Sequence, residues 1–281
     1  MQDQQASVRE HYANDNLEAR ILAGLTASGK DIERLEPDDL APVDEFHTRG
    51  RPATVDLARL LCVTQSDVVL DLGSGLGGPA RYLARTFGCA VSGVDLTPDF
   101  VATAIALSRR VGMAEAVTFR VGSALAIPFP DATFDVVWSQ NVAMNIADRA
   151  RLYHEVRRVL KPGGRYGFTD VVAGQGEAPL YPQPWASHAG QSHLLSADAT
   201  RAAIAAAGLM VTALDDQTGD ALALAIARRQ RDAKGPSLLG SHLMLGPAWP
   251  EISANIVRNF QEGRLGYVQG VAVRPPAVQG G

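Results

Sequence analysis

A carboxylate and a cluster of glycines stand together at the end of one apolar stretch. Residues 68–72 read Val-Val-Leu-Asp-Leu, and a turn that contains Gly73, Gly75 and Gly77 follows before a helix begins. Glycines let the backbone bend sharply and approach a ligand closely, so this turn predicts a site for a nucleotide-like cofactor. Backbone amides at such turns attract phosphate, whereas Asp71 just before the first glycine favours a cationic ligand. The alternative role of Asp71 is to cap the turn.

A second carboxylate, Asp95, lies about twenty residues beyond the glycine turn, after the apolar stretch 89–94. An acidic side chain at this spacing accepts hydrogen bonds from both hydroxyls of a ribose. Its alternative role is to cap the following helix together with Thr97. Because parallel strands present their carboxyl ends at one sheet edge, we expect Asp71 and Asp95 in one site.

The elements that position these residues alternate between strand and helix. Such an alternation predicts a parallel sheet with helices on both faces. We expect amphipathic helices at 8–27 and 52–62, with a charged, turn-rich strap at 30–44 between them. The later helices are expected from Pro98 to Val111 and at 196–207. The expected strands are 68–72, 89–94, 117–121, 134–139, 165–170 and, as the last two, 209–214 and 266–273.

The order of these segments resembles the class I S-adenosylmethionine-dependent methyltransferases, and the resemblance covers residues 46–216. It narrows to the branch of bacterial sarcosine/dimethylglycine methyltransferases. The residues that carry it are Phe46-His47-Thr48-Arg49-Gly50, the turn from Gly75 to Leu83, Asn145-Ile146-Ala147-Asp148-Arg149, and Asn259 to Arg264. Two positions depart from that branch: Ser123 stands where an acid is common, and Asn141 where a histidine is frequent.

The resemblance implies an α/β fold, with a Rossmann-like, doubly wound, seven-stranded and mostly parallel sheet whose last strand is antiparallel. N-terminal helices and a lid insertion would be added to it. The expected organisation is an N-terminal helical cap at 1–60, a methyltransferase domain at 61–274 with a substrate lid at 171–195, and a flexible tail at 275–281. The prediction of a lid is based on the length and composition of this segment, because long loops in compact domains are usually functional and this one carries aromatic residues.

The resemblance also implies S-adenosyl-L-methionine as the cofactor. Asp71 would meet its ammonium, Asp95 its ribose, and Gln140 its methionine part, while Ser123 and Ala124 would border the adenine. The full set of expected cofactor contacts is Asp71, Gly73, Ser74, Gly75, Gly77, Asp95, Leu96, Ser123, Ala124 and Gln140.

The acceptor site has weaker signals. The candidates for catalysis are His188, His193 and Asn145, and those for substrate binding are His47, Arg49, Tyr181, Trp185 and Asp170. A single histidine in a loop is more often a satisfied loop residue than a base. Aromatic faces such as Trp185 and Tyr181 suit a developing cation, and Arg49 or Arg81 suits a carboxylate. No histidine or cysteine spacing indicates a metal site.

These observations predict a methyltransferase that moves a methyl group to a small molecule, by in-line displacement in a closed pocket. By the resemblance the acceptor atom is an amine nitrogen, with oxygen, carbon or thioether sulfur as alternatives in a metabolite or natural-product pathway. Two further alternatives are a cofactor-binding protein that has lost catalysis and an NAD-linked oxidoreductase. Asp71 disfavours the oxidoreductase.

Composition limits the partners. With 281 residues, of which 46% are hydrophobic, the chain can bury one large core. A net charge of −4 gives no general attraction to nucleic acid or to an anionic membrane. The polar N-terminus and the lack of a long apolar run predict a cytoplasmic protein. A homodimer is a further partner that the sequence allows.

Overall fold

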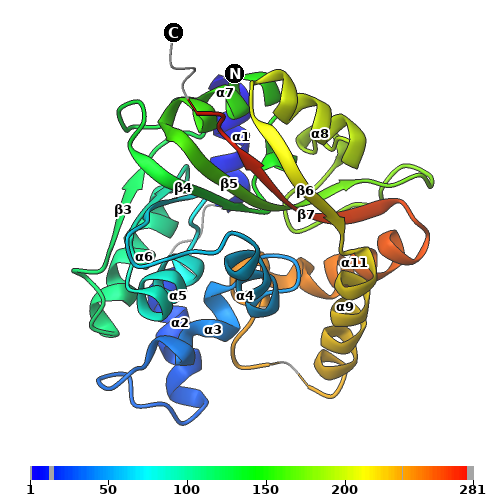
Figure 1. Ribbon diagram of the computed structural model, residues 1–281. Helices are drawn as coiled ribbons and strands as arrows, with labels where there is room; N and C mark the ends of the chain where they lie inside the picture. Colours follow the sequence, from blue (N-terminus) through cyan, green and yellow to red (C-terminus); the bar gives the residue numbers. More distant parts are fainter. Residues whose placement is uncertain (1, 13–15, 236, 277–281) are drawn as a thin grey trace, which may run out of the picture.

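A computed structural model describes residues 2–12, 16–235 and 237–276 of the chain (Figure 1). Most of the tail expected at 275–281 lies outside these residues. A seven-stranded sheet in the order β3-β2-β1-β4-β5-β7-β6 forms the centre. The strands are β1 (Val68–Leu72), β2 (Ala90–Asp95), β3 (Val117–Val121), β4 (Phe134–Gln140), β5 (Leu160–Ala173), β6 (Met210–Asp216) and β7 (Leu265–Val273).

Pairing within the sheet confirms the expected fold class. The strand pairs β1–β2, β1–β4, β2–β3 and β4–β5 are all parallel. The last strand, β7, runs antiparallel to both of its neighbours, β5 and β6. The strand order changes direction between β1 and β4, and β7 lies between β5 and β6. Because β1, β2 and β4 are parallel, their carboxyl ends share one edge.

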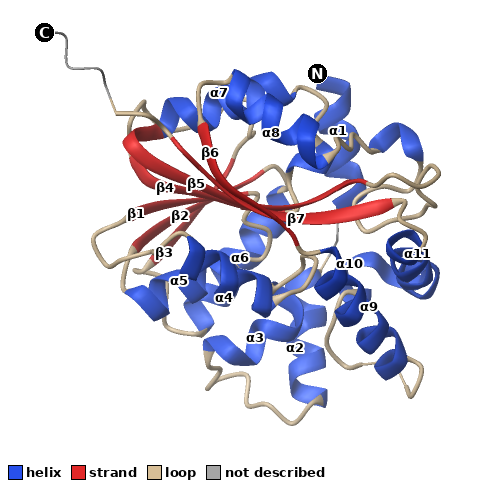
Figure 2. Cartoon of the chain, turned by 45° about the vertical axis from the view of Figure 1, so that its right-hand side comes forward, coloured by secondary structure: helices blue, strands red, loops and turns tan. Residues whose placement is uncertain are grey.

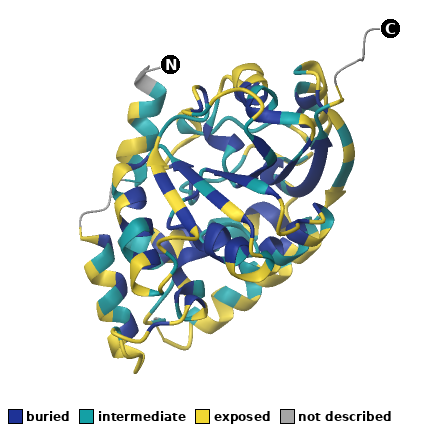
Figure 3. Ribbon diagram, turned by 60° about the vertical axis from the view of Figure 1, so that its left-hand side comes forward, coloured by how far each residue is buried: buried dark blue, intermediate teal, exposed yellow. Residues whose placement is uncertain are grey.

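Helices cover both faces of the sheet (Figure 2). Leu57, Leu83 and Ala104 bring α4, α5 and α6 against one face, and Leu152 and Ile204 bring α7 and α8 against the other. Figure 3 shows the buried strands inside and the exposed positions on the outer helices. The bounds are α4 (Arg51–Leu60), α5 (Gly78–Phe87), α6 (Pro98–Arg110), α7 (Arg149–Val159) and α8 (Ala197–Ala206).

The N-terminal region is helical and packs against α6, one of the helices that cover the sheet. It contains α1 (Gln2–Tyr12), α2 (Leu17–Ala27) and α3 (Pro37–Asp44). Ile21 and Leu25 pack in one buried cluster with Phe100 and Leu107 of α6. The strap expected at 30–44 therefore ends in a helix, which Glu36 and Asp39 begin with reciprocal capping hydrogen bonds.

An insertion between β6 and β7 adds a second helical group beside the sheet. It consists of α9 (Thr218–Asp232), α10 (His242–Leu245), the 3₁₀ turn η3 (Gly246–Ala248) and α11 (Trp249–Gln261). The segment expected as a lid holds the short turn η2 (Ala189–Gln191), and the turn η1 (Ala143–Asn145) follows β4. Within the described ranges, no helix has the length and apolar character needed to cross a membrane.

Candidate functional site

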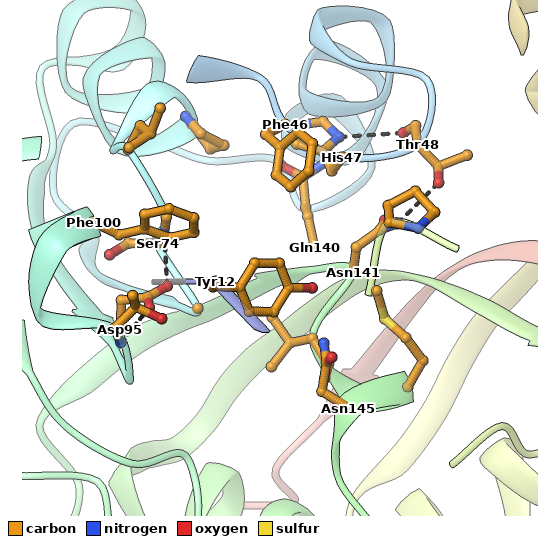
Figure 4. Close-up of a pocket in the computed structure, with 18 of the residues that line it drawn as sticks. Tyr12, Phe46, His47, Thr48, Ser74, Asp95, Phe100, Gln140, Asn141 and Asn145 are labelled. Atoms are coloured by element: carbon orange, nitrogen blue, oxygen red, sulfur yellow. Dashed lines mark hydrogen bonds between the residues drawn. The ribbon is translucent and has the colours of Figure 1, made fainter. Parts of the chain in front are cut away.

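A cavity of about 370 Å³ lies at the carboxyl edge of the sheet. Its walls come from the glycine turn, the ends of β2 and β4, the segment 44–49, and the helices α1, α9 and α11. Figure 4 shows Ser74, Asp95 and Phe100 on one side and Phe46, His47 and Asn141 on the other, with the ring of Tyr12 between them. Segments far apart in the sequence therefore meet at the edge that the two carboxylates predict.

Gly73 and Gly75 both line this cavity, and glycine is required at the two positions for different reasons. Gly73 has a φ of 76°, and a Cβ there would collide with the side chain of Val142. Gly75 has a φ of 49°, and a Cβ there would enter space with no protein atom within 4 Å. Gly75 thus leaves room beside its backbone for a ligand.

Gly77, which was expected to contact the cofactor, does not line the cavity. It begins α5 with a φ of 82°, and a Cβ there would lie 2.5 Å from the ring of Phe119 and 2.9 Å from Arg81. The structure therefore gives Gly77 a packing role behind the turn.

Asp71 is buried, and its Oδ2 atom has no hydrogen-bond partner among the described residues. Burial, together with the charges of the neighbouring Asp95 and Glu45, raises the pKa of this carboxyl to about 8. A carboxyl that is buried, unpaired and open to a cavity is suited to a cationic ligand.

Asp95 binds the start of α6, the alternative role that the sequence left open, and also lines the cavity. Its Oδ1 accepts a hydrogen bond from the backbone N–H of Thr97 at 2.8 Å, and its Oδ2 accepts one from the N–H of Gly75 at 2.9 Å. Each oxygen keeps a second lone pair, and the side chain still lines the cavity. Burial raises the pKa of this carboxyl also. Asp95 thus ties the glycine turn to β2 and can accept from a ligand's hydroxyls.

The remaining expected cofactor residues lie around the same space. Ser74, Leu96, Ser123, Ala124 and Gln140 all line the cavity. Oε1 of Gln140 accepts from the indole of Trp138 at 3.0 Å, which leaves its buried Nε2 without a partner in the described structure.

Ser123 has a partner that the sequence did not indicate. Its hydroxyl oxygen accepts a hydrogen bond from Nε2 of Gln5 at 2.8 Å, and Gln4 donates to the carbonyl of Asn145 at 2.9 Å. Gln4, Gln5, Val8 and Tyr12 place α1 in the cavity wall. Burial raises the pKa of the Tyr12 phenol well above its usual value, so this hydroxyl keeps its proton.

His47 lines the cavity, but both of its ring nitrogens are engaged. Nε2 lies 2.9 Å from Oε2 of Glu45, and Nδ1 lies 3.2 Å from the carbonyl of Thr48. Glu45 also pairs with Arg51 at 2.8 Å, and these neighbours lower its pKa against the effect of burial. His47 is therefore held beside the ion pair of Glu45 and Arg51.

The acceptor candidates divide into two groups. Asn145 and Arg49 line the cavity together with His47, whereas His188, His193, Tyr181, Trp185 and Asp170 do not. His188 is exposed to solvent, because it lies on an outward turn. The backbone of His193 is held by Met144 and Arg149, and burial followed by Arg149 lowers the pKa of its ring.

The aromatic residues of the expected lid pack inward on the protein instead of facing the cavity. Trp185 is buried beside Tyr181, and its indole donates to Ser192 at 2.9 Å. Asp170 faces Arg149 at 3.7 Å, and burial raises its pKa to about 6. The segment 171–195, which was expected as a lid, contributes Pro184 to the cavity wall.

Arg81 is also unavailable to a substrate. It is fully buried, pairs with Asp44 at 2.7 Å, and donates to the carbonyl of Leu76 at 2.7 Å. Its position supports the glycine turn from below.

The largest set of missed residues lies on α9 and α11. Ala221, Leu224, Ala225 and Arg228 line the cavity at the spacing of one helical face, and Trp249, Ser253 and Ile256 do so on α11. The basic residues at 228–231 have the composition of a solvated helix face, which by itself gives no sign that Arg228 lines a cavity. The spacing of the apolar residues that precede Arg228 was the available signal.

Comparison with known proteins identifies the central part of the chain. Residues 70–168 match the family described as Methyltransferase domain. Glycine/sarcosine/dimethylglycine N-methyltransferase of Actinopolyspora halophila is 37% identical over 132 residues, which are 47% of this chain and 23% of that protein. Sarcosine/dimethylglycine N-methyltransferase of Halorhodospira halochloris is 31% identical over 167 residues, 59% of this chain and 58% of that protein.

These alignments span less than two thirds of the relatives' own length, and other relatives are named for oxygen or carbon methylation. Among solved structures, the [4+2]-cyclase SpnF superposes with a TM-score of 0.71 at 22% identity, over 98% of this chain and 97% of that chain. Phosphoethanolamine N-methyltransferase 2 of Haemonchus contortus, in complex with S-adenosyl-L-methionine, superposes with a TM-score of 0.70 at 21% identity, over 83% of this chain and 54% of that chain. The structural likenesses establish the fold.

Proposed function

This chain carries the methyltransferase domain of the class I S-adenosylmethionine-dependent family and resembles its sarcosine/dimethylglycine branch, and from that premise we propose that it methylates a small molecule at an amine nitrogen. S-adenosylmethionine is the methyl donor of the family. The oxidoreductase alternative is set aside by this membership.

The residues present fit that cofactor. The unpaired Asp71 carboxyl suits its ammonium, and Asp95 suits its ribose hydroxyls. The open side of Gly75 leaves space for close approach. Bound there, the cofactor supplies an electrophilic methyl group on a positively charged sulfur. The chain's own contribution is to position the two reactants and to exclude water from the cavity.

The observation that favours an amine is the state of the titratable groups along the cavity. Both nitrogens of His47 are engaged, and the hydroxyl of Tyr12 keeps its proton. Asp71 and Asp95 lie at the cofactor end. A neutral amine attacks with a lone pair and needs no prior proton removal, whereas an alcohol or phenol usually needs a base. The named N-methyltransferase relatives support the same acceptor class.

The test is a screen of small amines, phenols, thioethers and hydroxy acids with a labelled methyl donor. We expect labelled amine product together with S-adenosylhomocysteine. Labelled phenols or hydroxy acids without labelled amines would contradict the acceptor assignment. Cofactor binding with no label transferred to any member, or to a cell metabolite pool, would support the alternative of a binding protein that has lost catalysis.

A further inference from the structure

The end of the cavity beside α9 and α11 is lined by apolar residues on one part of its wall and by arginines on another. We call it the acceptor end. One face of α9 supplies Ala221, Leu224 and Ala225, and α11 supplies Trp249 and Ile256. Val142, Met144 and Ile146 line the cavity from the segment after β4. These side chains form an apolar wall, which continues along α9 to the next residue of the same helical face, Arg228.

Arg228 brings a half-buried positive charge into the cavity. Its Nη1 donates a weak hydrogen bond to the hydroxyl of Ser241 at 3.3 Å, and the described residues place no carboxylate within ion-pair distance of it. Its neighbour Asp232 already accepts from the indole of Trp249 at 3.0 Å. Burial, followed by the charge of Arg231, lowers the pKa of the Arg228 guanidinium. A partly buried cation without a direct ion-pair partner is costly unless a ligand supplies the negative charge.

Arg49 lies in the same cavity wall with unused donors. Its side chain is 6% exposed, and its Nη2 atom pairs with Asp56 at 2.8 Å and Asp220 at 3.3 Å. Its Nε and Nη1 atoms are buried and have no partner in the described structure. Arg228 approaches this segment, since its Nη2 lies 4.0 Å from the position that a Cβ on Gly50 would take.

We propose that the methyl acceptor is an amphipathic acid, with an apolar body against the inner face of α9 and a carboxylate or phosphate bound by Arg228 with help from Arg49. This inference rests on the proposed function and specifies its substrate class. An arginine fork binds either anion through paired N–H donors, so the shared chemistry is that of an oxyanion. The apolar wall selects for an extended hydrocarbon portion beside it.

The experiment measures binding of simple probes by calorimetry to the chain saturated with S-adenosylhomocysteine. The probes are octanoate, octyl phosphate and octanol. We expect at least one of the two anions to bind about tenfold more tightly than octanol, and Arg228→Gln to remove that difference. The comparison of octanoate with octyl phosphate separates a carboxylate site from a phosphate site.

Arg229→Gln is the matched control. Arg229 is the next residue on α9, is exposed, and reaches the carbonyl of Pro250 instead of the cavity. Equal binding of octanol and both anions to the wild-type chain, or equal effects of Arg228→Gln and Arg229→Gln, would overturn the proposal.

A separate titration of the wild-type chain with S-adenosylmethionine keeps the two proposals distinguishable. Absence of cofactor binding would reject the proposed function, and the probes would then be measured on the free chain. Anion binding that depends on Arg228 under those conditions would support the oxyanion site by itself.

Discussion

At the scale of single residues, the cavity combines unpaired polar groups with glycines that leave space. Asp71 and Arg228 stand at different places in the same cavity, and their charged forms have opposite signs. Each lacks an ion-pair partner in the described structure. A ligand that is cationic at one end of the site and an acceptor that is anionic at the other would satisfy both.

Asp71 is predicted to release a proton when the cofactor binds. With its pKa raised to about 8, the free chain holds this carboxyl protonated at pH 7, and a cationic ligand favours the charged form. Affinity for S-adenosylmethionine should therefore rise with pH up to about pH 8, above which the ammonium of the cofactor loses its own proton and affinity falls again. Calorimetry at pH 7 in buffers of different ionisation enthalpy measures the proton.

Asp71→Asn is the control, because the ammonium of the cofactor titrates in the same range and remains in that variant. Proton release that is equal in both proteins would contradict the assignment.

The raised pKa of Asp71 also means that the folded free chain binds more protons than the unfolded chain between about pH 4 and pH 8. Asp71 therefore makes the free chain less stable as the pH rises through that window.

Gly75 and Gly77 should respond differently to alanine. Gly75→Ala places a methyl group in the open cavity at a φ of 49°, so we expect cofactor affinity to fall about tenfold with a stability loss of about 1 kcal/mol. Gly77→Ala meets Phe119 at 2.5 Å and should cost about 1–3 kcal/mol of stability. Urea unfolding and calorimetric titration of both variants check this contrast, which fails if both lose the same property.

At the scale of elements, two helical additions complete the site that the sheet edge begins. The wall beside Ser123 comes from α1, and the wall beside the apolar space comes from α9 and α11. The first adjoins the expected cofactor residues and the second adjoins the proposed acceptor. The two ends of the cavity can therefore be perturbed separately.

For α1, we predict that Gln5→Ala weakens cofactor binding a few-fold, because Ser123 loses the donor that holds the helix beside it at 2.8 Å. Glu10→Gln, at an exposed position of the same helix, is the control. Deletion of residues 1–12 should weaken binding further and leave the chain folded, since Leu17, Ile21 and Leu25 remain in their core. Unchanged cofactor affinity and turnover in the deletion would exclude α1 from the site.

At the scale of the whole molecule, the N-terminal region and the sheet share buried contacts. The side chains of Arg81 and Asp44 are each 1% exposed and join α5 to α3 with a 2.7 Å ion pair. Arg81 also binds Leu76 and Ser108, so one side chain links the glycine turn, α3 and α6. We propose that the cap at 1–60 and the methyltransferase domain unfold together.

Arg81→Leu is therefore predicted to destabilise the whole chain by about 3–5 kcal/mol, since it leaves the Asp44 carboxylate buried and unpaired. Burial already raises the pKa of Asp44 despite Arg81. Adding Asp44→Asn should recover part of the loss. Urea unfolding followed by near- and far-ultraviolet circular dichroism measures both quantities. Two separated transitions in the wild-type chain would contradict joint unfolding.

The sequence by itself determined the fold class and the place of the cofactor end. Apolar stretches before Asp71 and Asp95 predict parallel strands, and such strands bring their carboxyl ends to one edge regardless of loop detail. For this reason local patterns predict the two carboxylates, Gly73 and Gly75, and the structure places them around one cavity with Ser123 and Gln140, which the family resemblance implies.

Only the tertiary structure decided which side chains face the acceptor end. Trp185, Asp170 and His193 have the residue types of a substrate site, yet packing turns them into the protein or away from the cavity. Arg228 reads as part of a charged surface run, yet α9 lies so that its inner face borders the cavity. The direction of a side chain on a loop or added helix depends on how that element docks, which is set by contacts distant in sequence and leaves no local signature.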